Sequence, residues 1–185
     1  MSRGFSPVVI KMIGFLPDSN EPFDVSLVEA SNSADVALLR CSGITTEVPA
    51  LRLSEKAPEL GQSVLVLGYP TGIRALLART NPAFVDSLLQ IRPEPDFWQM
   101  AKKLADSGHV APLVTRGIVG QITPSAIVYD AETTHGGSGG PVIGLDGRVV
   151  AVNAAVVGDF GGSNLGVPVS AARELILRHL PLTDR

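Results

Sequence analysis

The chain has 185 residues, of which 45% are hydrophobic and 18% charged, and its formal net charge is −3. This length suits one domain or two small packed halves, and this composition predicts a buried core instead of a disordered chain. The acidic balance argues against nucleic acids and anionic membranes as partners, because both attract basic surfaces. The single cysteine, Cys41, excludes an internal disulfide.

The N-terminal part of the chain predicts short strands. Residues 8–15 are apolar, and we expect a strand there and no signal peptide, because Lys11 interrupts the apolar block and no small-residue cleavage site follows. Residues 23–30 alternate apolar and polar side chains with period two, as a half-buried strand does. Residues 36–39 predict another strand, and residues 51–72 predict a short strand, a loop, a second strand and a Gly/Pro turn.

Helix formers then dominate between residues 73 and 112, which we interpret as a helical insert. Asn81 followed by Pro82 predicts the cap and first turn of one helix. A second helix should begin at Asp96 and end at Gly108, with residues 97, 101 and 104 on one packing face. We favour a surface decoration over a lid for this insert.

Strand patterns return after Pro112, over residues 113–122, 125–131, 140–145, 148–157 and 163–170. Asp146-Gly147 between two apolar runs predicts a hairpin, and residues 171–180 predict a short amphipathic helix. Helices do not alternate with strands, so the order of elements favours an all-β fold of antiparallel barrels over a parallel α/β sheet.

One serine is surrounded by glycines in the stretch "THGGSGGPVIGLDGRVVAV", residues 134–152. A flexible linker would lack strand signals, whereas a strand and a hairpin follow this loop at once. Glycines on both sides of Ser138 permit positive φ and allow two amide hydrogens to point at one oxygen, as an oxyanion requires. From the residues alone, a serine nucleophile and a simple tight turn both remain open.

The segment "GGSGGPV" resembles the nucleophile loop of the trypsin/chymotrypsin-like serine proteases. Its surroundings resemble the disulfide-free bacterial HtrA/Deg-type branch, through "YDAETTHGGSGGPVIGLDGRVVAVNAA", "ADVALLR", "GQSVLVLGYPTG" and "TRGIVGQI". The resemblance covers residues 34–72 and 113 to about 170. It is weak before residue 34 and absent from residues 73–112.

The resemblance implies two packed antiparallel β-barrels in a single peptidase domain. Residues 1–72 would form a partial first barrel and residues 113–170 the second, followed by the helix at 171–180. It also implies a catalytic apparatus without metal or cofactor: Ser138 as nucleophile, Asp35 to orient the base, and the backbone amides of Gly136 and Ser138 as oxyanion hole.

The same resemblance implies a substrate site that binds a polypeptide as an added strand. Its residues would be Asn153, Ala154 and Ala155, with Thr133 and His135 in a wall of the specificity pocket. Alternative interpretations stay open at three positions. Asp35 taken alone reads as a turn residue, Asn153 can satisfy a neighbouring backbone group, and Glu132 can face water, which we favour, or select a basic side chain.

A serine hydroxyl needs a base, and in this family the base is a histidine ahead of the aspartate. The three histidines here are His109, His135 and His179, and none precedes Asp35. We expect His109 to lie in the insert and His179 on a solvated helix face. We do not expect His135 to act as the base, because a residue on the rim of the oxyanion loop lies on the wrong side of the hydroxyl.

We therefore expect a protease domain whose first strands and catalytic histidine were cut off, and which is inactive as this isolated chain. Exposed strand edges make a homo-oligomer possible. The alternatives are a non-catalytic descendant that binds extended peptides in its cleft, and a structural barrel whose glycine loop is only a turn. The compartment stays open, with cytoplasm favoured because no leader is visible.

Overall fold

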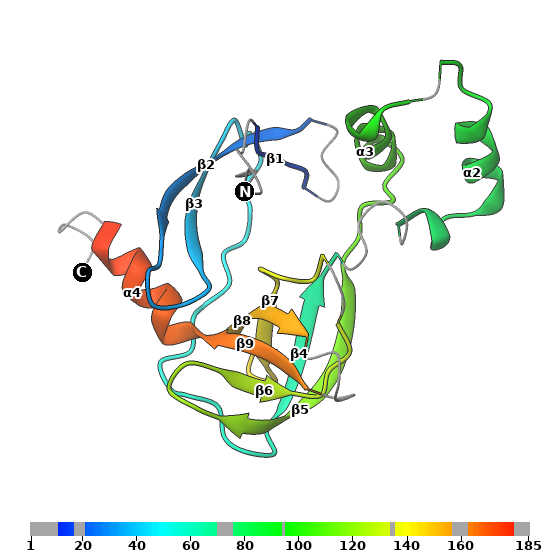
Figure 1. The fold of residues 1–185 in the computed structure, drawn as a ribbon. Helices are drawn as coiled ribbons and strands as arrows, with labels where there is room; N and C mark the ends of the chain where they lie inside the picture. Colours follow the sequence, from blue (N-terminus) through cyan, green and yellow to red (C-terminus); the bar gives the residue numbers. More distant parts are fainter. Residues whose placement is uncertain are drawn as a thin grey trace, which may run out of the picture.

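The computed structural model describes residues 11–16, 21–69, 76–93, 95–133, 136–156 and 163–179. Within these ranges the chain forms a three-stranded sheet, a closed barrel, a helical insert and a terminal helix (Figure 1). The prediction of an all-β class is therefore confirmed, with one complete barrel and a second, smaller sheet.

The smaller sheet contains β1 (Ile13–Gly14), β2 (Phe23–Ala30) and β3 (Ala37–Ser42), paired antiparallel in the order β1-β2-β3. The predicted strand at residues 8–15 is described only from residue 11 onward. The alternation predicted for residues 23–30 is interrupted by a register shift between Leu27 and Glu29, which leaves Leu27 56% exposed.

The barrel contains β4 (Ser63–Gly68), β5 (Leu113–Ile122), β6 (Ile127–Tyr129), β7 (Pro141–Gly144), β8 (Val149–Val156) and β9 (Asn164–Pro168). Its strand order is β4-β5-β6-β9-β8-β7, and the pairing of β4 with β7 closes the barrel. The Asp146-Gly147 hairpin prediction is confirmed: Gly147 has a φ of 79°, and the Gly144 amide donates to the Arg148 carbonyl at 2.9 Å. The short strand expected at the start of residues 51–72 is only an isolated bridge between Leu53 and Val149.

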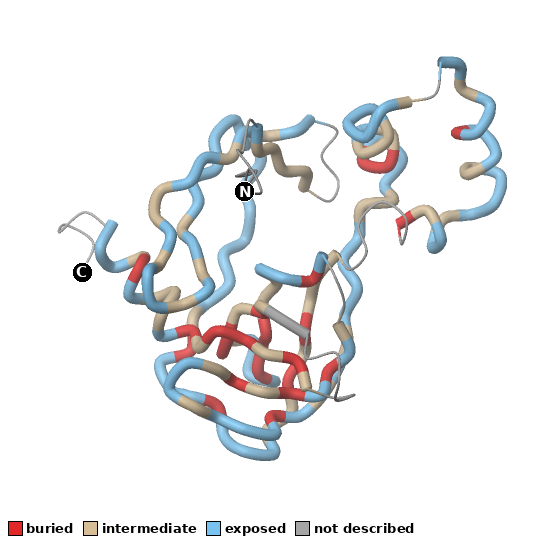
Figure 2. The backbone as a smooth tube through the Cα atoms, viewed as in Figure 1, coloured by how far each residue is buried: buried red, intermediate tan, exposed pale blue. Residues whose placement is uncertain are grey.

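Most of the buried residues lie in the barrel, and Figure 2 shows further red segments in the insert and in the C-terminal helix. Side chains from β4, β5, β6, β7 and β8 meet inside the barrel, among them Val64, Val66, Val119, Ile127, Tyr129, Val142, Val150 and Ala151. By contrast, no residue of β1, β2 or β3 is buried. The hydrophobic effect therefore stabilises the barrel strongly and the sheet weakly.

The insert contains α2 (Pro82–Leu89) and α3 (Phe97–Asp106), both capped as predicted. The Phe84 amide donates to the Asn81 side chain at 2.9 Å, and Asp96 with Gln99 forms a capping box. The predicted packing face of α3 is only partly correct. Leu104 is fully buried, but Phe97 is 62% exposed and lies edge-on against Trp98, with ring centroids 5.1 Å apart.

Helix α4 (Val169–His179) follows β9 directly and starts two residues before the predicted boundary. It packs against β3 of the sheet and against β8 and β9 of the barrel. Figure 1 shows it lying between the two β units. Among the residues that the structure describes, no helix has the length and apolarity needed to cross a membrane.

The difference between core and sheet predicts unequal mutational costs. We expect Ile127→Ala, at a side chain 1% exposed, to lower the free energy of unfolding by about 2–5 kcal/mol. Leu27→Ala in the sheet should cost no more than about 0.5 kcal/mol. Denaturant unfolding followed by circular dichroism measures both, and equal losses would contradict a core that lies mainly in the barrel.

A buried polar pair in the barrel gives a second prediction. The Tyr129 hydroxyl donates to Asn153 Oδ1 at 2.5 Å, and both residues are buried. Burial also raises the pKa of the Tyr129 phenol, which keeps it protonated as a donor. We expect Tyr129→Phe to cost about 1–3 kcal/mol because Asn153 Oδ1 loses its donor. Asn153→Ala removes the acceptor, so Tyr129→Phe should lower the free energy of unfolding less in that variant than in the parent chain. Equal losses in the two backgrounds would refute the pairing.

Candidate active site

The glycine loop that precedes β7 is fixed to the neighbouring strand β8. The Gly139 amide donates to the Asn153 carbonyl at 2.7 Å, and the Asn153 amide donates to the Gly140 carbonyl at 2.8 Å. Gly139 has a φ of 85°, which favours glycine, and a Cβ at Gly140 would lie 2.1 Å from the Leu67 carbonyl oxygen. The glycines therefore serve a tightly packed turn and not a flexible linker.

Ser138 is exposed on this loop, and its hydroxyl donates to the Ala154 carbonyl at 2.8 Å. A carbonyl oxygen accepts a hydrogen bond but does not remove the proton, so this contact does not activate the hydroxyl. The neighbouring Gly136 has a φ of 91°. Within the described ranges, no hydrogen bond donated by the backbone amide of Gly136 or Ser138 is found.

Asp35 lies in the tight turn between β2 and β3. The Ser31 amide donates to the Val36 carbonyl at 2.9 Å, and the Ala34 amide donates to Ser31 Oγ at 3.2 Å. The Asp35 carboxylate is exposed and has no hydrogen-bond or ion-pair partner among the residues described. It is therefore free to accept a hydrogen bond from a group that enters the site.

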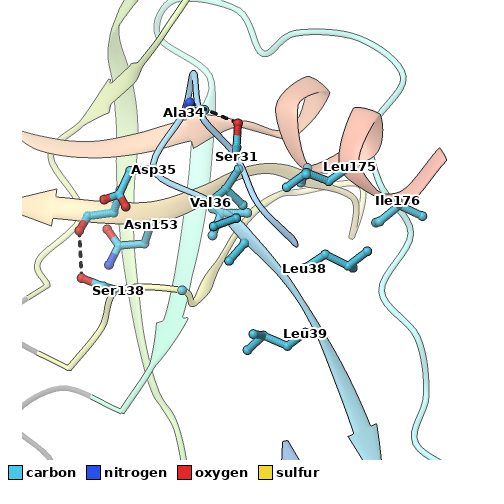
Figure 3. Close-up of a pocket in the computed structure, with 16 residues that line it drawn as sticks. Ser31, Ala34, Asp35, Val36, Leu38, Leu39, Ser138, Asn153, Leu175 and Ile176 are labelled. Atoms are coloured by element: carbon cyan, nitrogen blue, oxygen red, sulfur yellow. Dashed lines mark hydrogen bonds between the residues drawn. The ribbon is translucent and has the colours of Figure 1, made fainter. Parts of the chain in front are cut away.

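Asp35 and Ser138 line the same cleft, which encloses about 560 Å³ between the sheet, the barrel and α4. Figure 3 shows Asp35, Asn153 and Ser138 near one end of this cleft, with Leu38, Leu39, Leu175 and Ile176 toward the other. The structure thus brings together two side chains that are separated by about a hundred residues of sequence. The apolar wall from α4 was not anticipated: the amphipathic pattern of residues 171–180 signals a packing face, but not its target.

The two described histidines contact other groups. The His109 ring lies 4.5 Å from the Phe84 ring within the insert. His179 is exposed, as expected, and its Nε2 lies 2.6 Å from Glu29 Oε2. His135 lies outside the described residues. No histidine of the described part therefore supplies a base to Ser138.

The expected substrate-binding residues are placed as follows. Asn153 is buried, its side chain bonds to Tyr129 and, through Nδ2, to Thr133 Oγ1 at 3.4 Å, and its backbone bonds to the glycine loop. This placement agrees with the alternative that Asn153 satisfies neighbouring groups. Ala154 is half-buried beside Ser138, and Ala155 lies in β8 opposite Leu165. Glu132 is exposed, as favoured from the sequence.

Within the described ranges, no three histidine, cysteine, aspartate or glutamate side chains come close enough to hold an ion. The polar side chains that line this cleft are those of Ser31, Asp35, Ser138 and Asn153.

Comparison with solved structures supports the fold. A serine endoprotease from Yersinia pestis matches with a TM-score of 0.64 and 18% identity, over 91% of this chain and 48% of the other. The Rv3671c protease in an inactive form matches with a TM-score of 0.58 and 17% identity, over 86% of this chain and 69% of the other. The chain spans about half the length of the Yersinia enzyme.

The family assignment rests on sequence. The model of the trypsin-like peptidase domain matches residues 3–152, which is most of the chain and includes both Asp35 and Ser138. The chain therefore belongs to the trypsin-like peptidase family.

Proposed function

We propose that this chain supplies the nucleophile, the orienting carboxylate and the oxyanion-binding amides of a peptide-bond hydrolase, and that the base is an imidazole other than its own three. The observation that carries the proposal is the shared cleft. Ser138 and Asp35 both line it, yet the hydroxyl donates only to the Ala154 carbonyl and the carboxylate is unpartnered among the described residues. An imidazole in this cleft has a hydroxyl on one side and a carboxylate on the other.

The reaction follows from that arrangement. The imidazole takes the proton of Ser138 while Oγ bonds to the scissile carbonyl carbon, and Asp35 accepts the N–H on the far side of the ring. The amides of Gly136 and Ser138 stabilise the negative oxygen that forms. The imidazolium then protonates the departing amine as the C–N bond breaks. Water repeats the sequence on the acyl-serine, which releases the carboxylic acid and restores Ser138.

The substrate in this proposal is an extended polypeptide. β7 pairs with β8 only as far as Val152, so the stretch of β8 from Ala154 onward has no strand partner on that side among the described residues. A peptide that adds there as a strand passes directly beside Ser138, whose hydroxyl contacts Ala154. Thr133 and His135 belong to the proposed pocket wall. Asn153 supports this edge from within, since its own backbone groups are already bonded.

The isolated chain should then be inactive by itself. A serine hydroxyl bonded to a carbonyl is a weak nucleophile, and loss of one member of a catalytic unit costs nearly as much as loss of all. Binding of extended peptides without cleavage is the second candidate function, and the absence of a base near Ser138 in the described residues favours it.

Added imidazole separates these possibilities. We expect a fluorophosphonate probe to label Ser138 negligibly in buffer and at a rate that rises and saturates with imidazole, because the base binds in the cleft. Asp35→Asn should lower the rescued rate by about tenfold or more, since the ring loses its orienting partner. Mass spectrometry of the labelled chain measures both rates and locates the adduct.

Two controls complete this experiment. Ser138→Ala should abolish labelling, and His135→Ala should leave imidazole rescue intact. Rapid labelling without imidazole that disappears in His135→Ala would show that the chain's own histidine is the base. Absence of labelling at every imidazole concentration would favour the non-catalytic peptide-binding function.

A further inference from the structure

Helix α4 connects the two halves of the proposed active site. It packs against β3, which follows the turn bearing Asp35, and against β8, which holds Ala154 beside Ser138. Leu175 is 1% exposed and lines the same cleft as the two catalytic candidates. The strands of the sheet and of the barrel make no comparably extensive contact with each other in the described part of the chain. The position of the sheet relative to the barrel therefore depends mainly on this helix.

The barrel end of α4 is firmly attached. Val169, its first residue, packs in a buried cluster with Ile143 and Val149 of the barrel. The Arg173 guanidinium donates to the Ser54 carbonyl in the segment that leads to β4. These contacts combine apolar burial with a charge-assisted hydrogen bond, so the first turns of the helix move with the barrel.

At the sheet end of α4, one carboxylate of the sheet contacts two side chains of the helix. Glu29 Oε1 lies 3.1 Å from Arg178 Nη2, and Glu29 Oε2 lies 2.6 Å from His179 Nε2. Both partners occupy the last turn of α4, where the helix dipole favours positive charge. Glu29 therefore joins β2 to the helix end through both of its oxygens.

Glu29 is also close to Asp35 along the sheet. It pairs in register with Leu38, one step from the Ala30–Ala37 pair that closes the turn around Asp35. Because the sheet buries no residue, apolar packing does little to fix this turn. The polar contacts of Glu29 with α4 therefore contribute strongly to the position of the β2–β3 turn.

We propose that Glu29, Arg178 and His179 are positioning residues, which hold the β2–β3 turn so that Asp35 faces Ser138 across the cleft. The effect on the reactivity of Ser138 rests on the proposed function, whereas the contacts that position the turn do not. All three side chains are partly exposed, and such ion pairs contribute little to global stability and weaken in salt. The contact should therefore act on the distance between sheet and barrel more than on the unfolding of the barrel.

The native Cys41 allows a direct measurement of that distance. It is exposed on β3, and Leu145, exposed in the β7–β8 turn, offers a second labelling site as Leu145→Cys. Spin labels at both cysteines report the sheet-to-barrel distance by pulsed electron resonance on the full chain. We expect Glu29→Gln to broaden the distance distribution clearly, because the neutral amide loses the charge contact with Arg178 and the carboxylate acceptor for His179.

A matched control removes an ion pair of the same length elsewhere. Asp106→Asn breaks the exposed 3.1 Å pair between Lys102 and Asp106 on α3 and should leave the distribution unchanged. Glu29→Arg should broaden the distribution by like-charge repulsion with Arg178. Adding Arg178→Glu to it restores an opposite-charge pair and should narrow the distribution again. Unchanged distributions in Glu29→Gln and Glu29→Arg would overturn the inference.

The imidazole-rescued labelling of Ser138 tests the functional consequence. At saturating imidazole, Glu29→Gln should label about tenfold more slowly, a smaller loss than the hundredfold that a full 1 Å misplacement causes. The double variant Glu29→Arg, Arg178→Glu should recover most of the labelling rate. A broadened distribution with an unchanged rate would overturn the positioning role. If the parent chain shows no rescue at all, the proposed function fails, while the distance measurements still decide the structural part.

Discussion

The reciprocal backbone hydrogen bonds between the glycine loop and Asn153 are the constraint on which the site depends. They fix an irregular loop to β8, a strand of the closed barrel, and so place the Ser138 hydroxyl against Ala154. The contact is possible only with very small residues, because Gly140 lies against the Leu67 carbonyl. The tyrosine–asparagine pair beneath it satisfies the buried amide of the same strand. The barrel thus holds Ser138 in place, although the sequence around this serine is rich in glycine.

The other half of the site has a different physical basis. Asp35 comes from a sheet without buried residues, whose place is set by a helix and by a few partly exposed polar contacts. Weakly stabilised elements open more readily than core strands. The proposed nucleophile therefore lies on the stable part of the molecule, and the proposed orienting carboxylate lies on the less stable part. The distance between Ser138 and Asp35 therefore depends on the contacts that join the barrel to the sheet.

Much of this could be predicted because the signals are local. The Asp-Gly hairpin and the caps at Asn81 and Asp96 each depend on neighbouring residues, and all three are found in the structure. Long-range pairing is different. Nothing in the sequence around Glu29 indicates that it contacts His179, 150 residues away. The exposure of Phe97 likewise depends on packing between distant segments, which the local helix pattern does not specify. The placement of Asp35 near Ser138 followed only from the resemblance to a family, since no local pattern brings those positions together.

The single tryptophan of the chain lies at the start of α3 in the insert, edge-on to Phe97 and 45% exposed. Its ultraviolet emission therefore originates entirely in the insert, whereas the far-ultraviolet signal of β-structure originates in the barrel and sheet. A spectroscopist can consequently observe the two regions separately without introducing a dye. A ligand that quenches or shifts the emission must have reached the insert or altered its surroundings.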